Sequence, residues 1–413
     1  MIKFLIGMLL LILLVIAVTI FVKRQNIRLT KITSDKGIQE GTYINLGGIS
    51  QYINIRGENT GNPVILILHG GPGGAMSFFG YHWQTGLESD YTLVNWDQRG
   101  CGRTYYENLA SRAASAKGVS TKVKGAPANV TPSIASDAVA PSIASDGAPA
   151  HATVPALAPA PSPSAAPTPA PDLSKDLLLT DLDELVDYLI ERFGREKIII
   201  MGHSWGTILG SQYALAHPDK SAAYIAVGQA VDMPAGEALA KDTAILRAEA
   251  KGNQKYIDKL TALYDIVAPA KGSDMKNFVK MRGMTSKYLL CKESMPAWQM
   301  IWTGITAPDI SMRDLRWQLL SMLRVKKFFE LQAPLLPFLF EFNIYNASGT
   351  KYDVPVFFLS GDGDWITPYP LVRKYAKVVT APKKDMILIE NTGHSPFLDN
   401  PAAFCKAVRK VLK

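Results

Sequence analysis

The stretch from Lys197 to Gly210 constrains the fold more than any other part of this chain of 413 residues. Ile198 to Met201 is a continuous apolar run, too short for a helix, and such runs are typical of a buried strand in a parallel sheet. Gly202-His203-Ser204-Trp205-Gly206 follows it and matches G-x-S-x-G, and a helical segment then continues to His217-Pro218. A sharp turn from strand to helix needs glycines where a Cβ would clash, and it lifts the central serine above the sheet. We therefore predict a nucleophilic Ser204 rather than an ordinary Gly/Ser loop.

Composition excludes several classes of function. The formal net charge of +8 is modest for this length, and no basic run is interleaved with aromatic residues, so a nucleic-acid partner is not expected. The cysteines Cys101, Cys291 and Cys405 are odd in number and far apart, which predicts neither a disulfide framework nor a zinc site. No metal and no cofactor is expected.

The N-terminus carries a second strong signal. Phe4 to Val22 is a run of 19 residues without a charge, which at about 1.5 Å per residue nearly crosses a hydrocarbon core of about 30 Å. We predict an uncleaved membrane anchor over residues 1–24, with a cleaved signal peptide as the alternative. More basic residues follow the run than precede it, which favours a cytoplasmic catalytic domain and leaves the side of the membrane open.

Composition changes abruptly between about Ala110 and Pro171. This segment is rich in Ala, Pro, Ser and Thr, and the hexapeptide at 132–137 is repeated at 141–146. Such a segment cannot bury enough apolar surface to offset the entropy of ordering it. We predict a disordered insertion over 109–173 that carries no chemistry; the alternative is a peptide ligand for a proline-reading module.

Strand and helix patterns alternate on both sides of this segment. Apolar and polar residues alternate over 42–46 and 51–56, which predicts a hairpin of two strands. Thr180-Asp-Leu-Asp183 is a capping box and predicts the start of a helix that ends at Gly194. A second buried strand is predicted at 64–68, and further strands are predicted at 91–96, 222–227, 354–359 and 385–390. Residues 229–350 have helical patterns rich in Met, Trp and Phe, which predicts a helical cap over a largely apolar pocket. Trp298 and Trp302 are the predicted substrate-binding residues.

A serine nucleophile needs a histidine to take its proton and a carboxylate to orient that histidine. Where such a serine stands in a turn between a parallel strand and a helix, its two partners follow it in the sequence in the order Asp, His, on loops after strands. His394 is the downstream histidine in such a loop, and Asp362 and Asp364 compete for the role of the carboxylate. The glycine-rich loop His69 to Gly74 follows a predicted strand and is placed to supply an oxyanion-binding N–H group.

These motifs resemble one family. The chain has His-Gly-Gly-Pro-Gly at 69–73, Asp-Gln-Arg-Gly-Cys-Gly at 97–102, Gly-His-Ser-Trp-Gly at 202–206, Gly-x-x-Asp-x-x-x-Pro at 361–368 and Gly-His-Ser-Pro at 393–396. Together they resemble the proline iminopeptidase-like serine hydrolase branch of the α/β-hydrolase superfamily, over residues 40–108 and 174–413.

The resemblance implies an α/β-hydrolase fold, a mostly parallel sheet flanked by helices with a helical cap insertion, here preceded by the transmembrane helix. The core would occupy 40–108, 174–228 and 351–413, and the cap 229–350. The resemblance also implies that Asp364 is the catalytic carboxylate, and that the backbone N–H groups of Gly71 and Trp205 form the oxyanion hole.

One departure from the family bears on the substrate. Proline iminopeptidases are expected to hold the free α-amine with cap carboxylates, one of them in a Trp-Glu-Gly stretch, whereas this chain has Trp302-Thr303-Gly304. Glu293 and Asp309 are possible substitutes.

The leading hypothesis is a serine hydrolase of an amide or ester, related to proline iminopeptidases. Its alternatives are a carboxylesterase or lipase for lipophilic esters and, outside enzymes, a membrane-anchored binding protein on a hydrolase scaffold. Epoxide hydrolases and dehalogenases are disfavoured because they use an aspartate where Ser204 stands.

Overall fold

The structure, a computed structural model, describes residues 1–116 and 172–413. Met1–Leu109 and Ala170–Lys413 belong to one compact unit, and Ala110–Pro169 form a second. Most of the predicted insertion, residues 117–171, lies outside the described residues. The predicted bounds of 109–173 stay a prediction; helix α2 (Gly102–Ala116) begins before residue 109 and continues beyond it, and Leu173 is buried in the core.

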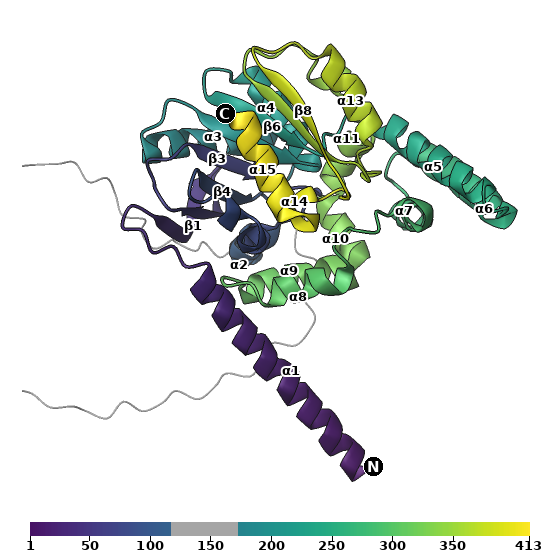
Figure 1. The fold of residues 1–413 in the computed structure, drawn as a ribbon, viewed down its shortest axis with the longest axis horizontal. Coiled ribbons are helices and arrows are strands. Elements are labelled where there is room, and N and C mark those ends of the chain that lie inside the picture. Colours follow the sequence, from purple (N-terminus) through teal and green to yellow (C-terminus); the bar gives the residue numbers. More distant parts are fainter. Residues whose placement is uncertain (117–171) are drawn as a thin grey trace, which may run out of the picture. The chain divides into compact units, whose positions relative to one another are not determined.

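An eight-stranded sheet forms the centre of the first unit, in the order β1-β2-β4-β3-β5-β6-β7-β8 (Figure 1). β1 and β2 form the predicted hairpin, β2 is antiparallel to β4, and the remaining neighbours are parallel. The strands are β1 Ile38–Leu46, β2 Ile49–Gly57, β3 Val64–Leu68, β4 Thr92–Asp97, β5 Ile198–His203, β6 Ser221–Val227, β7 Val356–Gly361 and β8 Lys384–Ile389.

Both faces of the sheet are covered, which explains why its central strands are continuous apolar runs. Side chains alternate between the faces, so Ile200 packs in one core cluster with helices α3 (Lys175–Phe193), α4 (Trp205–Ala216) and α13 (Tyr369–Val378). Ile199 packs in the other, with α15 (Pro401–Leu412) and the short helix at Ser77–His82. The chain therefore forms a mostly parallel sheet flanked by helices, as predicted.

Helix α3 begins before the predicted start at Thr180. Ser174 is its N-cap and accepts from the backbone N–H of Leu177, whereas the Thr180 hydroxyl lies inside the helix and donates to the carbonyl of Asp176. The helix extends towards its N-terminus because Leu178 is also buried against the sheet. Its end at Gly194, which has a φ of 57°, is as predicted.

Between β6 and β7 the chain is helical, as predicted for the cap. Its helices are α5 Met233–Glu249, α6 Gln254–Ala270, α7 Met275–Leu289, α8 Ala297–Ile305, α9 Met312–Leu323, α10 Val325–Gln332, α11 Leu336–Phe340 and α12 Ile344–Ala347. A buried ion pair between Arg103 and Asp314, 2.7 Å long, fastens α9 to the start of α2, just after β4. The cap is thereby held over the ends of the strands that carry the predicted site residues.

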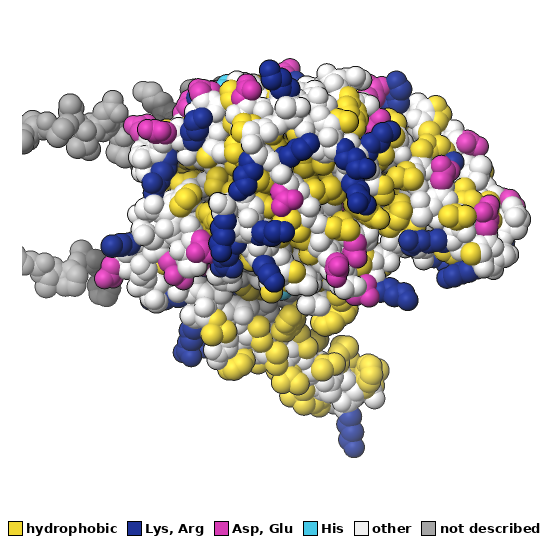
Figure 2. Space-filling model, turned by 45° about the horizontal axis from the view of Figure 1, so that its top comes forward, with side chains coloured by type: hydrophobic (Ala, Val, Ile, Leu, Met, Phe, Trp, Pro, Cys, Tyr) yellow, Lys and Arg dark blue, Asp and Glu magenta, His cyan; other side chains and the backbone are white. Residues whose placement is uncertain are grey.

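The N-terminal helix α1 (Ile2–Leu29) is long and apolar enough to cross a membrane, a test that a signal sequence also passes. Its apolar side chains are exposed along most of its length, and Figure 2 shows them as a continuous apolar surface. Its last turn is fastened to the cap, because the Asn26 amide donates to the carbonyl of Thr306, just after α8, at 2.9 Å. Arg56 donates to the carbonyl of Thr30 just beyond the helix.

Candidate active site

Ser204 lies in the sharp turn between β5 and α4. It has a φ of 52° and a ψ of −118°, a conformation that is uncommon for a residue with a side chain. The turn requires its two glycines: a Cβ on Gly202 would lie 2.5 Å from the carbonyl oxygen of Gly206, and a Cβ on Gly206 would lie 2.1 Å from that of Leu68. The strained turn places Ser204 in the wall of a cavity.

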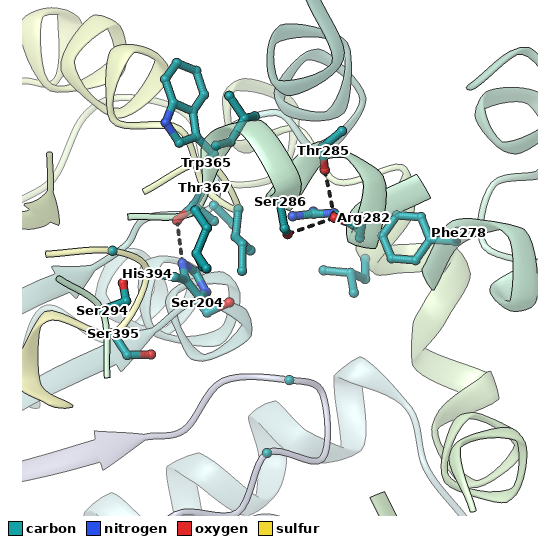
Figure 3. A pocket seen from close by; sticks show the side chains of 18 of the residues that line it. Ser204, Phe278, Arg282, Thr285, Ser286, Ser294, Trp365, Thr367, His394 and Ser395 are labelled. Carbon is teal, nitrogen blue, oxygen red and sulfur yellow. Dashed lines mark hydrogen bonds between the residues drawn. The ribbon is translucent and has the colours of Figure 1, made fainter. Parts of the chain in front are cut away.

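His394 lies in the loop after β8 and lines the same cavity as Ser204 (Figure 3). Its Nδ1 is 3.0 Å and 3.1 Å from the two carboxylate oxygens of Asp364, which follows β7. The carboxylate also accepts the backbone N–H groups of Ile366 and Thr367 and the Thr367 hydroxyl, at 2.8 to 3.0 Å.

These contacts fix the charge of the carboxylate. Asp364 is fully buried, and burial by itself raises a carboxyl pKa; the charge of His394 and the hydrogen bonds from His394 and Thr367 outweigh burial and lower the pKa of Asp364 below its ordinary value. An ionised carboxylate only accepts, so Nδ1 of His394 carries the proton. Nε2 is then free to accept a proton from a substrate or a nucleophile.

The structure distinguishes the two aspartates that the residue pattern left open. Asp362 accepts the backbone N–H of Thr392 at 3.2 Å, so it stabilises the loop that carries His394 (the histidine loop) without a hydrogen bond to the histidine itself. Asp364 is the aspartate that bonds to His394.

The glycine-rich loop after β3 packs against the serine. A Cβ on Gly70 would lie 3.2 Å from the Ser204 Cβ, and one on Gly71, where φ is 122°, would lie 2.6 Å from the backbone nitrogens of Gly73 and Gly74. Gly71 lines the same cavity as Ser204, and Trp205 is the first residue of α4. The two predicted oxyanion donors are therefore brought to the same serine from different elements.

The cavity has a volume of about 510 Å³ and lies between the strand ends and the cap. Figure 3 shows Ser204 and His394 on one side of it and Phe278, Arg282 and Ser286 of α7 on the other. Its lining is mostly apolar. The apolar residues include Met233, Phe278, Leu289, Met295, Met300, Phe328, Phe329, Leu336, Leu339, Phe340, Trp365 and Leu398.

Comparison with known proteins agrees with this architecture. Residues 65–407 match the profile of the Alpha/beta hydrolase family. The chain is a member of that family.

Individual relatives are distant. The hydrolase is 22% identical to the "Probable aminopeptidase YbaC" of Bacillus subtilis over 375 residues, which is 89% of this chain and 94% of that protein. The crystal structure of a proline iminopeptidase-related protein from Thermus thermophilus matches with a TM-score of 0.51 at 18% identity, covering 91% of this chain and 97% of the other. An epoxide hydrolase from Vigna radiata matches with a TM-score of 0.48, also at 18% identity, covering 91% and 97%. At 18% identity the first of these structural matches describes the fold alone.

Two histidines near the serine of this hydrolase are not proton carriers. Nε2 of His203 is 3.0 Å from the carbonyl oxygen of His394, and burial together with the charge of His394 lowers the pKa of His203 to about 3. Nδ1 of His69 is 2.8 Å from the carbonyl of Gly70, and burial lowers the pKa of His69 to about 4. Both rings are neutral at pH 7. His203 therefore donates to the histidine loop and holds it in place.

The residue pattern gave no signal for Asp399, which follows the histidine loop in α14 (Pro396–Asp399). Its carboxylate accepts the backbone N–H of Gly393 at 2.8 Å, the backbone N–H of Met295 at 2.7 Å and the hydroxyl of Ser294 at 3.2 Å. Asp399 thus connects the loop that carries His394 to the cap. Nothing local marks it, because its cap partners lie about a hundred residues away in the sequence.

Trp298 and Trp302, the predicted substrate-binding residues, are not among the described residues that line this cavity. Among the described residues, α8 contributes Met300 to the cavity wall and neither tryptophan, and Trp298 is 69% exposed. The reason is helical geometry. Residues two positions apart on a helix lie on nearly opposite sides, so Met300 facing the cavity turns both tryptophans away.

The cavity offers no free carboxylate for a substrate amine. Of the described residues that line it, Asp399 is the one carboxylate, and its oxygens already accept three hydrogen bonds. Thr303 is buried, and its carbonyl accepts the Tyr81 hydroxyl. Glu293 and Asp309 are absent from the lining, and Arg282, which lines the wall, is paired with Glu237 outside it.

Proposed function

We propose that this protein is a serine hydrolase in which Ser204 is the nucleophile, His394 the general base and Asp364 the carboxylate that orients it. The observation that carries the proposal is the His394–Asp364 pair beside a serine in a strained strand-to-helix turn, within one cavity. Family membership supports it, because α/β-hydrolases place a triad at this turn and at the loops that follow later strands.

The mechanism follows from the protonation states. Nδ1–H of His394 is held by the ionised Asp364, so Nε2 takes the Ser204 proton as the hydroxyl oxygen attacks a substrate carbonyl. The negative charge that develops on the carbonyl oxygen is received by the backbone N–H groups of Gly71 and Trp205, the second of which also lies at the N-terminus of α4. His394 then protonates the leaving group, and water hydrolyses the acyl-enzyme by the same route.

A fluorophosphonate probe tests this assignment, because it reacts with an activated serine. The intact protein is expected to be labelled and Ser204→Ala is not, while Ser395→Ala, a neighbouring serine in the cavity wall, keeps its labelling. Labelling that survives in Ser204→Ala would refute the assignment, and a protein that is never labelled would favour the binding-protein alternative.

For the substrate we propose an uncharged, lipophilic acyl compound, with esters preferred over prolyl amides. An ammonium group in an apolar cavity without a partner carboxylate costs several kcal/mol, and Asp399 is committed to backbone and hydroxyl donors. The relative named as a probable aminopeptidase favours the second candidate, an aminopeptidase that cleaves an N-terminal residue.

One kinetic comparison separates the two candidates. We expect kcat/KM for a medium-chain acyl ester to exceed that for a prolyl anilide of similar size. A strong preference for the prolyl substrate that disappears on N-acetylation would establish the aminopeptidase and an ammonium site that opens on binding.

We propose in addition that α1 stays attached and anchors the protein in a membrane. Its exposed apolar surface has no other partner among the described residues, and its final turn is hydrogen-bonded to the cap. The full-length mass should be found in the membrane fraction after alkaline extraction. A mature protein that lacks the first residues and is released into the soluble fraction would instead identify a signal peptide.

A further inference from the structure

Helix α9 presents an apolar face to solvent. Met312, Leu319, Met322 and Leu323 are 65%, 55%, 51% and 76% exposed, and their spacing places them on one side of the helix. The opposite side is buried: the Trp317 indole N–H donates to the carbonyl of Gly73 at 2.9 Å. This face therefore has no partner among the described residues, although it is as apolar as a packed one.

Helix α8, which precedes α9, also exposes apolar side chains. Trp298 and Ile301 are 69% and 46% exposed. The other six of the chain's seven tryptophans are buried or half-buried. Tryptophan with aliphatic neighbours is the composition of a helix that lies at a membrane interface. Exposed basic residues on α9 and at the start of α10 suit an anionic headgroup layer, although Lys327 is paired with Glu330: Arg316, Arg324, Lys326 and Lys327.

The position of α1 identifies what covers this surface. The Asn26 amide in the last turn of α1 donates to the carbonyl of Thr306, the residue that caps the C-terminus of α8. Figure 1 shows α8 and α9 beside this end of α1. A bilayer that contains α1 would therefore meet α8 and α9 where α1 leaves it.

Helix α8 also contributes to the wall of the cavity that contains Ser204. Met300 of α8 and Phe328 and Phe329 of α10 form part of the cavity wall. A lipophilic molecule at the exposed face of α8 is thus separated from the cavity by the thickness of one helix.

We propose that α8 and α9 lie in the interfacial layer of the bilayer that α1 enters, and that the cavity receives its substrate, a long-chain acyl ester, from that bilayer. The proposal rests on the hydrolase function and the anchor proposed above. It assigns the exposed face, defined by Trp298, Ile301, Met312, Leu319, Met322 and Leu323, to lipid rather than to a protein partner.

Fluorescence quenching tests the contact with lipid independently of any activity. The full-length protein is reconstituted in phosphatidylcholine vesicles with brominated acyl chains, which quench nearby tryptophans. Trp298→Phe should remove most of the quenching, and Trp365→Phe, a half-buried tryptophan of the cavity wall, should remove little. Equal quenching in wild type and Trp298→Phe would overturn the proposal.

Kinetics test the route of the substrate. In vesicles, Trp298→Gln combined with Leu323→Gln should lower kcat/KM for a long-chain ester dissolved in the bilayer about tenfold, because the apolar area that docks to lipid is reduced. Hydrolysis of a short, water-soluble ester should be unchanged. The matched control, Leu246→Gln with Ile266→Gln, alters side chains of α5 and α6 that are 65% and 53% exposed, and should change neither rate.

The outcomes separate the two proposals. An unchanged rate on the bilayer ester, with the short ester still hydrolysed, overturns the lipid surface and leaves the hydrolase intact. No hydrolysis of either ester and no fluorophosphonate labelling would refute the hydrolase instead, and the quenching result would still decide the surface. A variant that changes the oligomeric state but not the quenching would assign the face to a second copy and overturn the proposal.

Discussion

The two walls of the catalytic cavity are built in different ways. On the sheet side, Ser204, Asp364 and His394 lie in the turn or loops that follow β5, β7 and β8, and strained backbone at Ser204 and several hydrogen bonds hold them. On the cap side, α7, α10 and α11 contribute mainly Phe, Leu and Met side chains, which are held by packing. Directional bonds fix a reacting geometry, whereas packing fixes only a volume. For the proposed hydrolase, the difference means that the sheet side would determine which bond is broken and the cap side which molecule is accepted.

The first prediction tests the sheet side and has the largest expected effect. Asp364→Asn keeps the shape but removes the charge that holds Nδ1–H of His394, so kcat should fall about 10⁴-fold, as in the serine-protease template. Asp362→Asn keeps an oxygen to accept the Thr392 N–H and should change kcat only slightly. Steady-state kinetics on one ester compare the two variants, and equal losses would contradict the assignment.

The second prediction concerns Asp399, where the two walls are joined. Asp399→Ala leaves the N–H groups of Gly393 and Met295 without their acceptor, so the histidine loop and the cap are no longer held in fixed positions relative to each other. We expect kcat to fall about 10- to 100-fold and KM to rise, because a lost charge-assisted hydrogen bond is worth about 1.5–3 kcal/mol. Asp385→Asn, an exposed acid on β8, is the control. A change in KM alone would mean that Asp399 serves only the cap.

The third prediction tests the cap side. Phe329→Ala removes an aromatic side chain from the cavity wall and should raise KM for a medium-chain ester about tenfold, with kcat nearly unchanged. Leu246→Ala, on an exposed face of α5, should alter neither constant. A large fall in kcat with KM unchanged would break the division between the two walls.

The fourth prediction concerns stability and has the smallest effect on activity at neutral pH. The pKa of about 3 for His203 in the folded chain lies below the ordinary value of 6.5. Between these values the unfolded chain binds a proton that the folded chain does not, so His203 costs stability as the pH falls, by about 1.4 kcal/mol per pH unit.

His203→Gln is the variant that tests this, because the glutamine amide can still donate to the His394 carbonyl. As the pH is lowered from 6.5 towards 4, the free energy of unfolding of the variant should rise relative to that of the wild type. Denaturant unfolding at several pH values measures the difference. A difference that does not depend on pH would show that His203 titrates normally.

Much of the sheet could be predicted because its signals are local. Ile198–His203 and Val64–Leu68 are apolar runs of strand length, and alternating apolar and polar residues predict the hairpin of β1 and β2, although β2 is buried along most of its length. The start of α3 was missed because two capping residues, Ser174 and Thr180, precede the same apolar stripe. Burial of Leu178 against the sheet selected the earlier one.

The sequence by itself determined the chemistry of this protein's candidate site: a serine in a glycine-bounded turn and one downstream histidine after a strand. Those signals are readable because strain and strand burial restrict which residues can stand at each position. Tertiary structure alone decided that Asp364 rather than Asp362 meets His394, since two positions on one loop differ only in the direction they face. It also decided that Trp298 faces outward, because the rotation of α8 is set by distant contacts. Gly304 lies against Phe78, and Thr306 accepts from Asn26, and neither partner is near them in the sequence.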